Sequence, residues 1–206
     1  MVQDTLFTSG EQIRLRSVSE DLARTTLGQG AWLDFRPGWV LGAGVLFDRL
    51  LSAVPWSAER RPMYDRIVEV PRLSYFYDTG AALPDPAVEE MLGALSDHYG
   101  PALGEPLETV GCCLYRDGSD SVAWHGDRIG RSSHVDTVVA IVSLGAQRRF
   151  LLRLRGGGPA KRLDVAAGDL LVMGGSCQRT WEHAVPKTRR AAGARISIQF
   201  RPWGVR

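Results

Sequence analysis

Residues 136–155 read DTVVAIVSLGAQRRFLLRLR, and this stretch decides the fold because it holds two short runs rich in strand-forming residues. Runs of the same kind lie on both sides of it, separated by polar or glycine-rich breaks such as Gly156–Pro159. Many short strands at such spacing favour a sandwich or a barrel. The flanking runs are VGCCLY at 110–115, SVAWHGD at 121–127, KRLDV at 161–165, DLLVMG at 169–174 and ARISIQFR at 194–201.

The segment before residue 110 contains two predicted helices. Gly42 to Val54 reads as a helix that Pro55 ends. Pro86 to Tyr99 reads as a second helix, because Asp85 suits its N-cap, Pro86 its first turn and Gly100 its end. Its apolar residues form one stripe, so this helix covers a core. Helices ahead of a set of strands would buttress one sheet, which predicts an α+β domain with a β-sandwich centre.

The same segment also contains short strand-forming runs. Ile67–Val70 and Leu73–Tyr77 are rich in such residues, and Pro71-Arg72 is expected to interrupt them. Residues 1–30 show only weak periodicity. We expect them to form an N-terminal extension that packs on the main domain at residues 31–206.

The composition is that of a globular chain with reduced thiols. The 206 residues suit one domain, and a hydrophobic content of 44% argues against global disorder. The cysteines are odd in number and lack zinc-ligand spacing, so a disulfide framework is not expected. The longest uncharged apolar stretch, Pro37–Phe47, is too short to span a bilayer, and residues 1–16 lack the apolar segment of a signal peptide. We expect a cytoplasmic monomer with no membrane partner.

The formal net charge of +2 hides an asymmetry between the two halves of the chain. Basic minus acidic residues give 9 − 14 = −5 for residues 1–100 and 16 − 9 = +7 for residues 101–206. A basic half attracts polyanions and supplies phosphate contacts, but an arginine-rich solvated surface has the same composition. Charge alone therefore does not identify the partner.

His125 and Asp127 stand two residues apart in WHGD, a spacing that places both side chains on one face of an extended strand. His183 follows 183 − 127 = 56 residues later, beyond several predicted strands that can return it to the pair. Two imidazoles and a carboxylate on one side of a metal form the facial triad of non-haem iron(II) oxygenases, and they leave the opposite side open. By spacing alone, surface or core histidines remain the alternative interpretation.

The run ARISIQFR at 194–201 provides a second feature. Its alternation places Arg195, Ser197, Gln199 and Arg201 on one face and apolar residues on the other. Arginines on an inward face are costly unless they meet an anion, and a dicarboxylate such as 2-oxoglutarate suits two guanidinium groups. An edge strand with solvated arginines is the alternative.

Several blocks of the sequence, in order, resemble the AlkB family of Fe(II)- and 2-oxoglutarate-dependent dioxygenases. The blocks cover much of the chain between Pro71 and Pro202, and their shared order is more specific than any single motif. They are PRLSYFYD (71–78), LYRDGSDSVAWHGD (114–127), SLGAQRRFLLR (143–153), GDLLVMGGSCQRTWEHAVPK (168–187) and ARISIQFR (194–201).

The resemblance implies a fold and a metal site. The fold is a double-stranded β-helix, or jelly roll, with N-terminal helices and strands packed against it. The metal would be Fe(II), held by His125, Asp127 and His183. The expected reaction uses O2 and 2-oxoglutarate to remove alkyl groups from the bases of DNA or RNA, in single or double strands, and would release succinate, carbon dioxide and an aldehyde.

The resemblance also implies positions for the cosubstrate and the substrate. Tyr115 and Arg195 would bind the distal carboxylate of 2-oxoglutarate, and Arg201 would hold the carboxylate next to the keto group. Tyr77 falls where the family presents a tyrosine on the substrate side. Arg128 follows the metal ligand Asp127 and would contact either the base or a phosphate.

The sequence departs from the family pattern at three places. Cys113 replaces the usual asparagine two residues before the cosubstrate tyrosine. Ser197 and Gln199 replace Asn and Thr in the closing motif, although the Ser197 hydroxyl is still able to hydrogen-bond a carboxylate. Arg128-Ile129 replaces the acidic residues that follow the metal ligands in many repair enzymes and favour a cationic base.

These departures leave the substrate open. Preference for 1-methyladenine or 3-methylcytosine over neutral adducts is in question, and no group that reads the RNA 2′-hydroxyl is evident. Two alternatives use the same sequence features. One is a 2-oxoglutarate oxygenase that acts on a protein or a small molecule, and the other is a non-catalytic nucleic-acid-binding relative.

Overall fold

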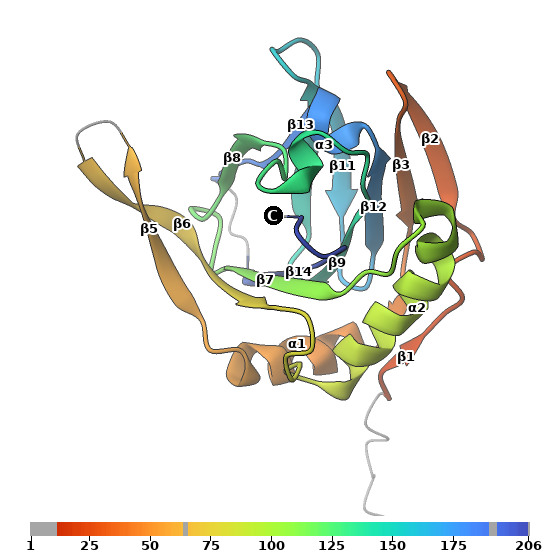
Figure 1. Ribbon diagram of the computed structural model, residues 1–206. Coiled ribbons are helices and arrows are strands. Elements are labelled where there is room, and N and C mark those ends of the chain that lie inside the picture. The colour runs from red at the N-terminus through yellow and green to blue at the C-terminus, as the bar shows by residue number, and fades with distance from the viewer. Residues whose placement is uncertain (1–11, 64–65, 190–192, 206) are drawn as a thin grey trace, which may run out of the picture.

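The strand-forming runs build two antiparallel sheets that face each other in the computed structural model, which describes residues 12–63, 66–189 and 193–205 (Figure 1). The helices are α1 (Ala43–Ala53), α2 (Pro86–Leu103) and α3 (Cys177–Thr180), with a 3-10 turn at Arg131–Ser133. The strands are β1 (Arg14–Leu15), β2 (Ala23–Gly28), β3 (Ala31–Arg36), β4 (Val40–Leu41), β5 (Ser57–Met63), β6 (Arg66–Tyr77), β7 (Thr109–Tyr115), β8 (Val122–His125), β9 (Val139–Gly145), β10 (Arg148–Leu154), β11 (Lys161–Val165), β12 (Leu170–Gly175), β13 (Trp181–Val185) and β14 (Arg195–Arg201).

The larger sheet has eight strands in the order β2-β3-β12-β9-β14-β7-β6-β5, and the smaller has four in the order β11-β10-β13-β8. A separate two-stranded sheet pairs β1 with β4. In Figure 1 the four-stranded sheet lies across one face of the larger sheet, while α1 and α2 lie on its other face. The predicted α+β class with a jelly-roll core is confirmed.

Strand β14 shows how alternation places the two cores. Ile196, Ile198 and Phe200 are fully buried in the core that also contains residues of α1 and α2. The alternate residues Arg195 and Ser197 face the space between the two sheets, where a second core surrounds Tyr115. The polar face of β14 therefore points into the jelly roll, and this face carries the site.

The second helix runs further than its sequence predicted. Asp85 caps α2 as expected, since its carboxylate accepts a hydrogen bond from the Ala87 amide at 2.9 Å. The expected end at Gly100 is wrong, because α2 continues to Leu103 and ends at Gly104, which has φ 81°. Gly100 serves a close approach instead, since a Cβ there would lie 3.2 Å from the Glu105 carbonyl oxygen.

The expected interruption at Pro71-Arg72 is also absent, because β6 is one continuous strand. The β6 residues that pair with β5 skip from Glu69 to Leu73, because the register shifts between these two positions. Pairing with β7 begins at Leu73. Pro71 thus lies where the ladder is locally broken, and a strand tolerates a residue without an N–H group there.

Part of the predicted N-terminal extension forms an edge of the large sheet. Strand β2 pairs with β3, and the predicted boundary between residues 30 and 31 falls at the turn that joins them. Arg24 donates to both carboxylate oxygens of Asp34 across this pair, at 2.6 and 2.7 Å. Residues 1–11 of the extension lie outside the described residues.

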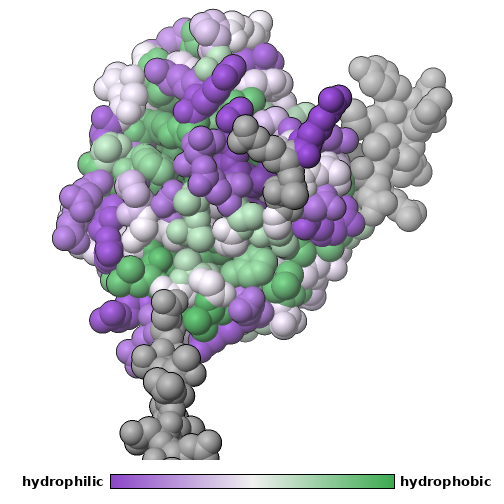
Figure 2. All heavy atoms as spheres, turned by 180° about the vertical axis from the view of Figure 1, so that it is seen from behind, coloured by the Kyte–Doolittle hydropathy of each residue, from purple (hydrophilic) through white to green (hydrophobic). Residues whose placement is uncertain are grey.

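Viewed from behind, the surface intersperses hydrophilic and hydrophobic residues (Figure 2). A few large hydrophobic side chains are exposed on the described surface, and Ile129 and Trp203 are the most exposed of them, at 64% and 62%. No helix within residues 12–63, 66–189 and 193–205 is long and apolar enough to cross a membrane.

Candidate active site

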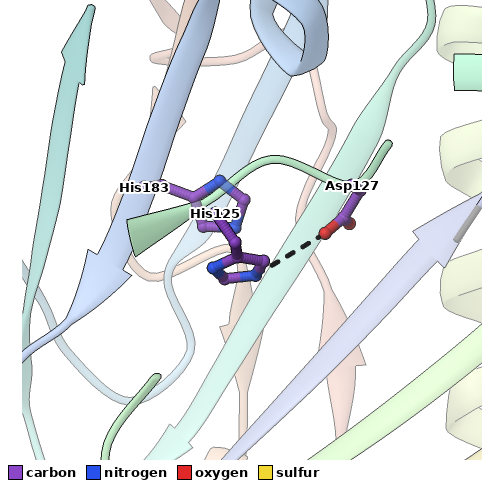
Figure 3. A group of neighbouring side chains, drawn as sticks. All are labelled: His125, Asp127 and His183. Atoms are coloured by element: carbon purple, nitrogen blue, oxygen red, sulfur yellow. Dashed lines mark ion pairs between the residues drawn. The ribbon is translucent and has the colours of Figure 1, made fainter. Parts of the chain in front are cut away.

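The two histidines of the predicted triad come from neighbouring strands of the small sheet. His125 ends β8 and pairs in register with His183 of β13, so that their ring centroids lie 4.2 Å apart. Asp127 follows β8 in a loop, and its Oδ1 atom lies 3.7 Å from Nε2 of His125 (Figure 3). One ligand atom from each of the three residues lies within 4.8 Å of the others, so the fold brings the predicted metal ligands together.

His125 is oriented by its own strand. Its Nδ1 lies 2.8 Å from the carbonyl oxygen of Ala123, which only accepts hydrogen bonds. Nδ1 is therefore the donor in this contact, and Nε2 is the ring nitrogen directed toward the triad. A metal-binding histidine commonly has its tautomer fixed by such a backbone carbonyl.

His183 is buried and held neutral. Its ring stacks on Phe150 with a centroid distance of 5.3 Å and an interplanar angle of 17°. Burial, with a smaller contribution from the neighbouring His125, lowers the pKa of His183 to about 3, although Asp127 acts to raise it. A neutral imidazole offers the lone pair that a divalent metal takes.

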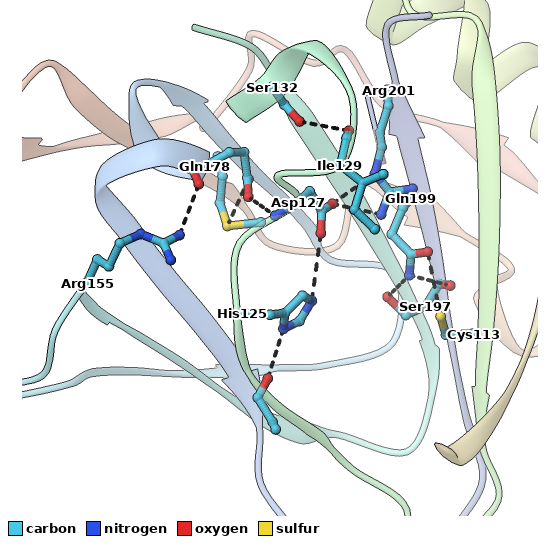
Figure 4. A network of polar contacts seen from close by, with 12 residues as sticks. Cys113, His125, Asp127, Ile129, Ser132, Arg155, Gln178, Ser197, Gln199 and Arg201 are labelled. Carbon is cyan, nitrogen blue, oxygen red and sulfur yellow. Dashed lines mark hydrogen bonds and ion pairs between the residues drawn. The ribbon is translucent and has the colours of Figure 1, made fainter. Parts of the chain in front are cut away.

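Asp127 is buried and held as a carboxylate. Burial acts to raise its pKa, but the charge and the hydrogen bond of Arg201, together with the neighbouring imidazoles, outweigh burial and lower the pKa well below its ordinary value. Nε of Arg201 donates to Oδ2 at 2.8 Å, and Gln178 accepts a hydrogen bond from the Asp127 amide at 2.9 Å (Figure 4). Oδ2 is thus occupied by Arg201, while Oδ1 faces His125.

Gly126 lies between the predicted metal ligands His125 and Asp127, where the chain packs too closely against α3 to allow a side chain. A Cβ at this position would lie 2.6 Å from the Gln178 carbonyl oxygen, which real side chains do not tolerate. The loop carrying Asp127 therefore runs directly against α3, and this contact fixes the carboxylate relative to the two histidines.

Arg195 lies at the other end of β14 and fits an anion. Its side chain is 2% exposed, and its Nε donates to Ser143 Oγ at 2.8 Å. Within the described residues its Nη1 atom is buried without a hydrogen-bond partner. Burial lowers the pKa of Arg195, while Tyr115 raises it. A buried cation with an unused donor is costly unless a carboxylate meets it, so the position suits a carboxylate of 2-oxoglutarate.

Tyr115 flanks Arg195 as its register partner in β7. Burial, together with Cys113, raises the pKa of Tyr115 to about 12, which keeps its hydroxyl neutral and able to donate. The Arg195 guanidinium carbon lies 5.3 Å from the centre of the Tyr115 ring. The structure therefore brings together the two residues predicted to share one carboxylate.

Ser197 lies between the two arginines and is held by Gln199. Nε2 of Gln199 donates to Ser197 Oγ at 2.7 Å, and the Cys113 thiol donates to Oε1 of Gln199 at 3.7 Å. Because the Ser197 oxygen already accepts, its own hydrogen is available for donation. Three of the residues that depart from the family pattern, Cys113, Ser197 and Gln199, thus form one connected group.

Tyr77 and Arg128 are not brought to the triad. Tyr77 pairs with Val110 and is buried in the core on the helix side of the sheet, where burial raises its pKa to about 12. Its neighbour Phe76 pairs with Gly111 on the opposite face, which carries the site. Arg128 is exposed. The substrate-binding roles of Tyr77 and Arg128 stay predictions.

Sequence reasoning missed Ser143, Gln178 and Phe76. Ser143 had a signal, because it is a polar residue inside the apolar run 138–144. Gln178 had none, since its contact with Asp127 depends on how α3 packs 51 residues further along the chain. Phe76 was hidden by the neighbouring tyrosines, which lie on the other face of β6.

Comparison with known proteins agrees with this site. Residues 75–201 match the 2OG-Fe(II) oxygenase superfamily, so the chain belongs to that family. The predicted Fe(II) and 2-oxoglutarate are the cofactors that this family and the His-Asp-His triad imply.

Within the superfamily the chain is similar to AlkB-like members. It is 28% identical over 186 residues to human alpha-ketoglutarate-dependent dioxygenase alkB homolog 3, covering 80% of this chain and 64% of that protein. It is 28% identical over 208 residues to DNA oxidative demethylase ALKBH2 of Arabidopsis thaliana, covering 82% of this chain and 63% of that protein. The chain thus spans less than two thirds of the length of these curated relatives.

Solved structures share the fold. The structure of OsALKBH1 superposes with a TM-score of 0.61 at 17% identity, covering 87% of this chain and all of that chain. A 2OG-Fe(II) oxygenase family oxidoreductase from Burkholderia pseudomallei gives a TM-score of 0.55 at 16% identity, with 76% of each chain covered.

Proposed function

We propose that this protein oxidatively dealkylates N-alkylated bases in DNA or RNA. Two observations together support the proposal: the geometry of the site and the similarity of the chain to AlkB-like proteins. The chain holds a preformed His-Asp-His triad, and about four fifths of it aligns with proteins named for alkB-type dioxygenase and DNA oxidative demethylase activity.

The chain supplies one set of groups for each cofactor. His125, Asp127 and His183 would hold Fe(II), and Arg195 with Tyr115 would bind one carboxylate of 2-oxoglutarate. When bound, the two cofactors activate O2, yielding succinate and carbon dioxide while an alkyl carbon attached to a base nitrogen is hydroxylated. The hydroxylated product then releases an aldehyde and the restored base.

The protein's own part in the reaction is positioning and exclusion of water. Asp127, His183 and Arg195 are each less than 10% exposed, whereas the imidazole of His125 is 35% exposed. The site is therefore open on the His125 side and closed at the predicted cosubstrate end. A substrate that approaches from the open side meets the metal without exposing the arginine end to water.

A base in a duplex must be extruded, or taken from a single strand, to reach such a site. The positive charge of residues 101–206 favours a polyanion, and one relative, ALKBH2 of Arabidopsis thaliana, is named as a DNA oxidative demethylase. Turnover of the DNA and RNA oligonucleotides described below, in single and double strands, would show which of these the protein prefers.

The test combines anaerobically iron-loaded protein with O2, 2-oxoglutarate and a panel of alkylated DNA and RNA oligonucleotides. Mass spectrometry would follow the alkyl mass, and succinate would be measured in the same samples. Loss of the alkyl mass that requires both iron and 2-oxoglutarate is the expected result. Succinate release without dealkylation would point to a protein or small-molecule substrate, and oligonucleotide binding without either product would point to a non-catalytic relative.

A further inference from the structure

Strand β8, which ends at the predicted metal ligand His125, is held only loosely by its own sheet. It lies at the edge of the four-stranded sheet, so β13 is its one neighbour among the described strands. Its register pairs are His125 with His183 and Val122 with Val185, and the register shifts between them. A short edge strand with a disrupted ladder needs further contacts to keep a metal ligand in place.

Arg153 of β10 supplies one such contact across the outer face of β13. Its guanidinium carbon lies 4.0 Å from the centre of the Trp124 ring, and its Nε donates to Oε1 of Glu182 at 2.6 Å. Glu182 is the register partner of Arg153 in β13, so its carboxylate fixes the guanidinium group over Trp124. The Arg153 and Glu182 side chains are 27% and 13% exposed, and partial burial strengthens both contacts. Because Trp124 directly precedes His125, the contact restrains β8 at the metal ligand.

Arg155 follows β10 and contacts the loop that carries Asp127. Its Nε donates to the Arg179 carbonyl oxygen at 3.0 Å, and its Nη2 donates to that of Gln178 at 3.4 Å. A Cβ at Gly126 would lie 3.0 Å from the same Nη2 atom, so the guanidinium group packs against this glycine. Gln178 in turn accepts the hydrogen bond from the Asp127 amide (Figure 4). Arg155 therefore acts on Asp127 through Gln178.

Arg149, on the same face of β10 as Arg153, provides a matched comparison. Its Nε lies 3.6 Å from Oδ1 of Asp164, and both side chains are more than half exposed. Asp164 belongs to β11, which pairs with β10 on the side away from β8. Removing Arg149 therefore takes the same charge from the same strand without altering the contacts of the metal-ligand segment.

We propose that Arg153 and Arg155 are positioning residues that hold the first two metal ligands from outside the jelly roll and thereby set the affinity of the metal site. Arg153 acts through Trp124, and Arg155 acts through Gln178. Groups that orient metal ligands contribute about 10- to 100-fold to metal affinity. The inference concerns the metal site alone, so it holds whichever substrate the protein oxidises.

The experiment measures how tightly the metal-free protein, as the whole chain, binds Co(II). The visible absorption of the bound ion would be followed in competition with a chelator. We expect Arg153→Met to weaken Co(II) binding about 10-fold. Arg155→Met should weaken it about 3-fold, because the Arg155 side chain is more exposed. The control Arg149→Met should bind Co(II) like wild type.

A double-mutant cycle separates positioning from a general loss of stability. If Arg153 acts through Trp124, Arg153→Met should have no further effect on Co(II) affinity in a Trp124→Ala background, whereas independent effects would add. Trp124→Phe keeps a ring under the guanidinium group and should keep most of the affinity.

Urea denaturation of the metal-free variants would identify any that do not fold. Should Arg153→Met be one of them, Arg153→Lys gives the same comparison. It keeps the charge but loses the planar stacking and the paired donor geometry, so we expect about a 3-fold loss of Co(II) affinity.

Unchanged Co(II) affinity in the variants of both arginines would overturn the inference. An equal loss in Arg149→Met, or additive losses in the Trp124 cycle, would overturn it as well. None of these measurements depends on turnover. A failure to dealkylate any oligonucleotide would therefore count against the proposed function and leave this inference standing.

Discussion

The two ends of β14 carry an arginine each, on the same face of one strand, yet the two side chains differ in what they meet. Arg201 donates to the Asp127 carboxylate and is 12% exposed. Arg195 is more deeply buried, and its Nη1 has no hydrogen-bond partner in the described chain. The Arg201 cation is already neutralised by a predicted metal ligand, whereas the Arg195 cation is preorganised for an anion that no described residue supplies.

This difference assigns the two arginines different tasks. Arg201 fixes the orientation of the Asp127 carboxylate, so that Oδ1 is left for the metal. Arg195 contributes binding energy to an incoming carboxylate, since its desolvation has already occurred on folding. Variants at the two ends should therefore fail in different ways.

The largest effect on activity is expected at Asp127, which links Arg201 to the predicted metal site. Asp127→Ala removes a ligand and leaves Arg201 without its partner, so iron binding and turnover should both be lost. Iron content after anaerobic loading and succinate release would measure this. Asp97→Ala is the matched control, and iron-dependent turnover by the Asp127 variant would contradict the site assignment.

A change at the anion end should act on cosubstrate affinity. Arg195→Met should raise the KM for 2-oxoglutarate about 100-fold, because a buried carboxylate would lose its charged partner. Succinate release at varied 2-oxoglutarate concentration measures the shift, with Arg195→Lys as the charge-retaining comparison. An unchanged KM would show that the cosubstrate carboxylate lies elsewhere.

The free energy of unfolding of the metal-free protein compares the two arginines most directly. Arg201→Met should cost about 3 kcal/mol, because it leaves the buried Asp127 charge unpaired. Arg195→Met should change stability by less than about 1 kcal/mol, because the loss of its hydrogen bond to Ser143 is offset by the removal of a buried cation whose Nη1 donor is unused. Urea denaturation without metal or 2-oxoglutarate would compare the two, and equal losses would contradict the assignment of tasks.

The smallest effect is expected between the arginines. Ser197→Ala removes a neutral hydroxyl and should raise the KM for 2-oxoglutarate about 3-fold. The exposed Ser52→Ala on α1 is the control in the same assay. A larger effect than that of Arg195→Met would mean that the hydroxyl, and not the guanidinium, carries the carboxylate.

Much of the fold was predictable because strand alternation reports burial locally. The apolar residues of ARISIQFR face the helix-side core, and the arginines face the interior of the jelly roll, as their period of two requires. Pro71 and Gly100 were both predicted to end an element, and both predictions were wrong. Pro71 is tolerated inside β6 because pairing with β5 is interrupted there. Gly100 lies inside α2 because the chain after the helix packs closely against it.

The metal ligands were predictable, but the network around them was not. His125 and Asp127 are close in sequence, and the ordered blocks identified His183. The Arg201–Asp127 contact joins residues 74 positions apart and depends on the register between β14 and β7. The cavity between the end of β6 and the segment after β14 depends likewise on where that segment returns, and no short sequence pattern predicts that.

The link between the triad and the large sheet, through Arg201, has a consequence for motion. Two ligands lie on the small sheet, and the third is tied through Arg201 to the large one. Any fluctuation that separates the two sheets must therefore either break the Arg201–Asp127 pair or move Asp127 away from the histidines. A divalent metal bound by all three residues would oppose this separation. Amide hydrogen exchange in β8 and β13 should therefore slow when manganese is added.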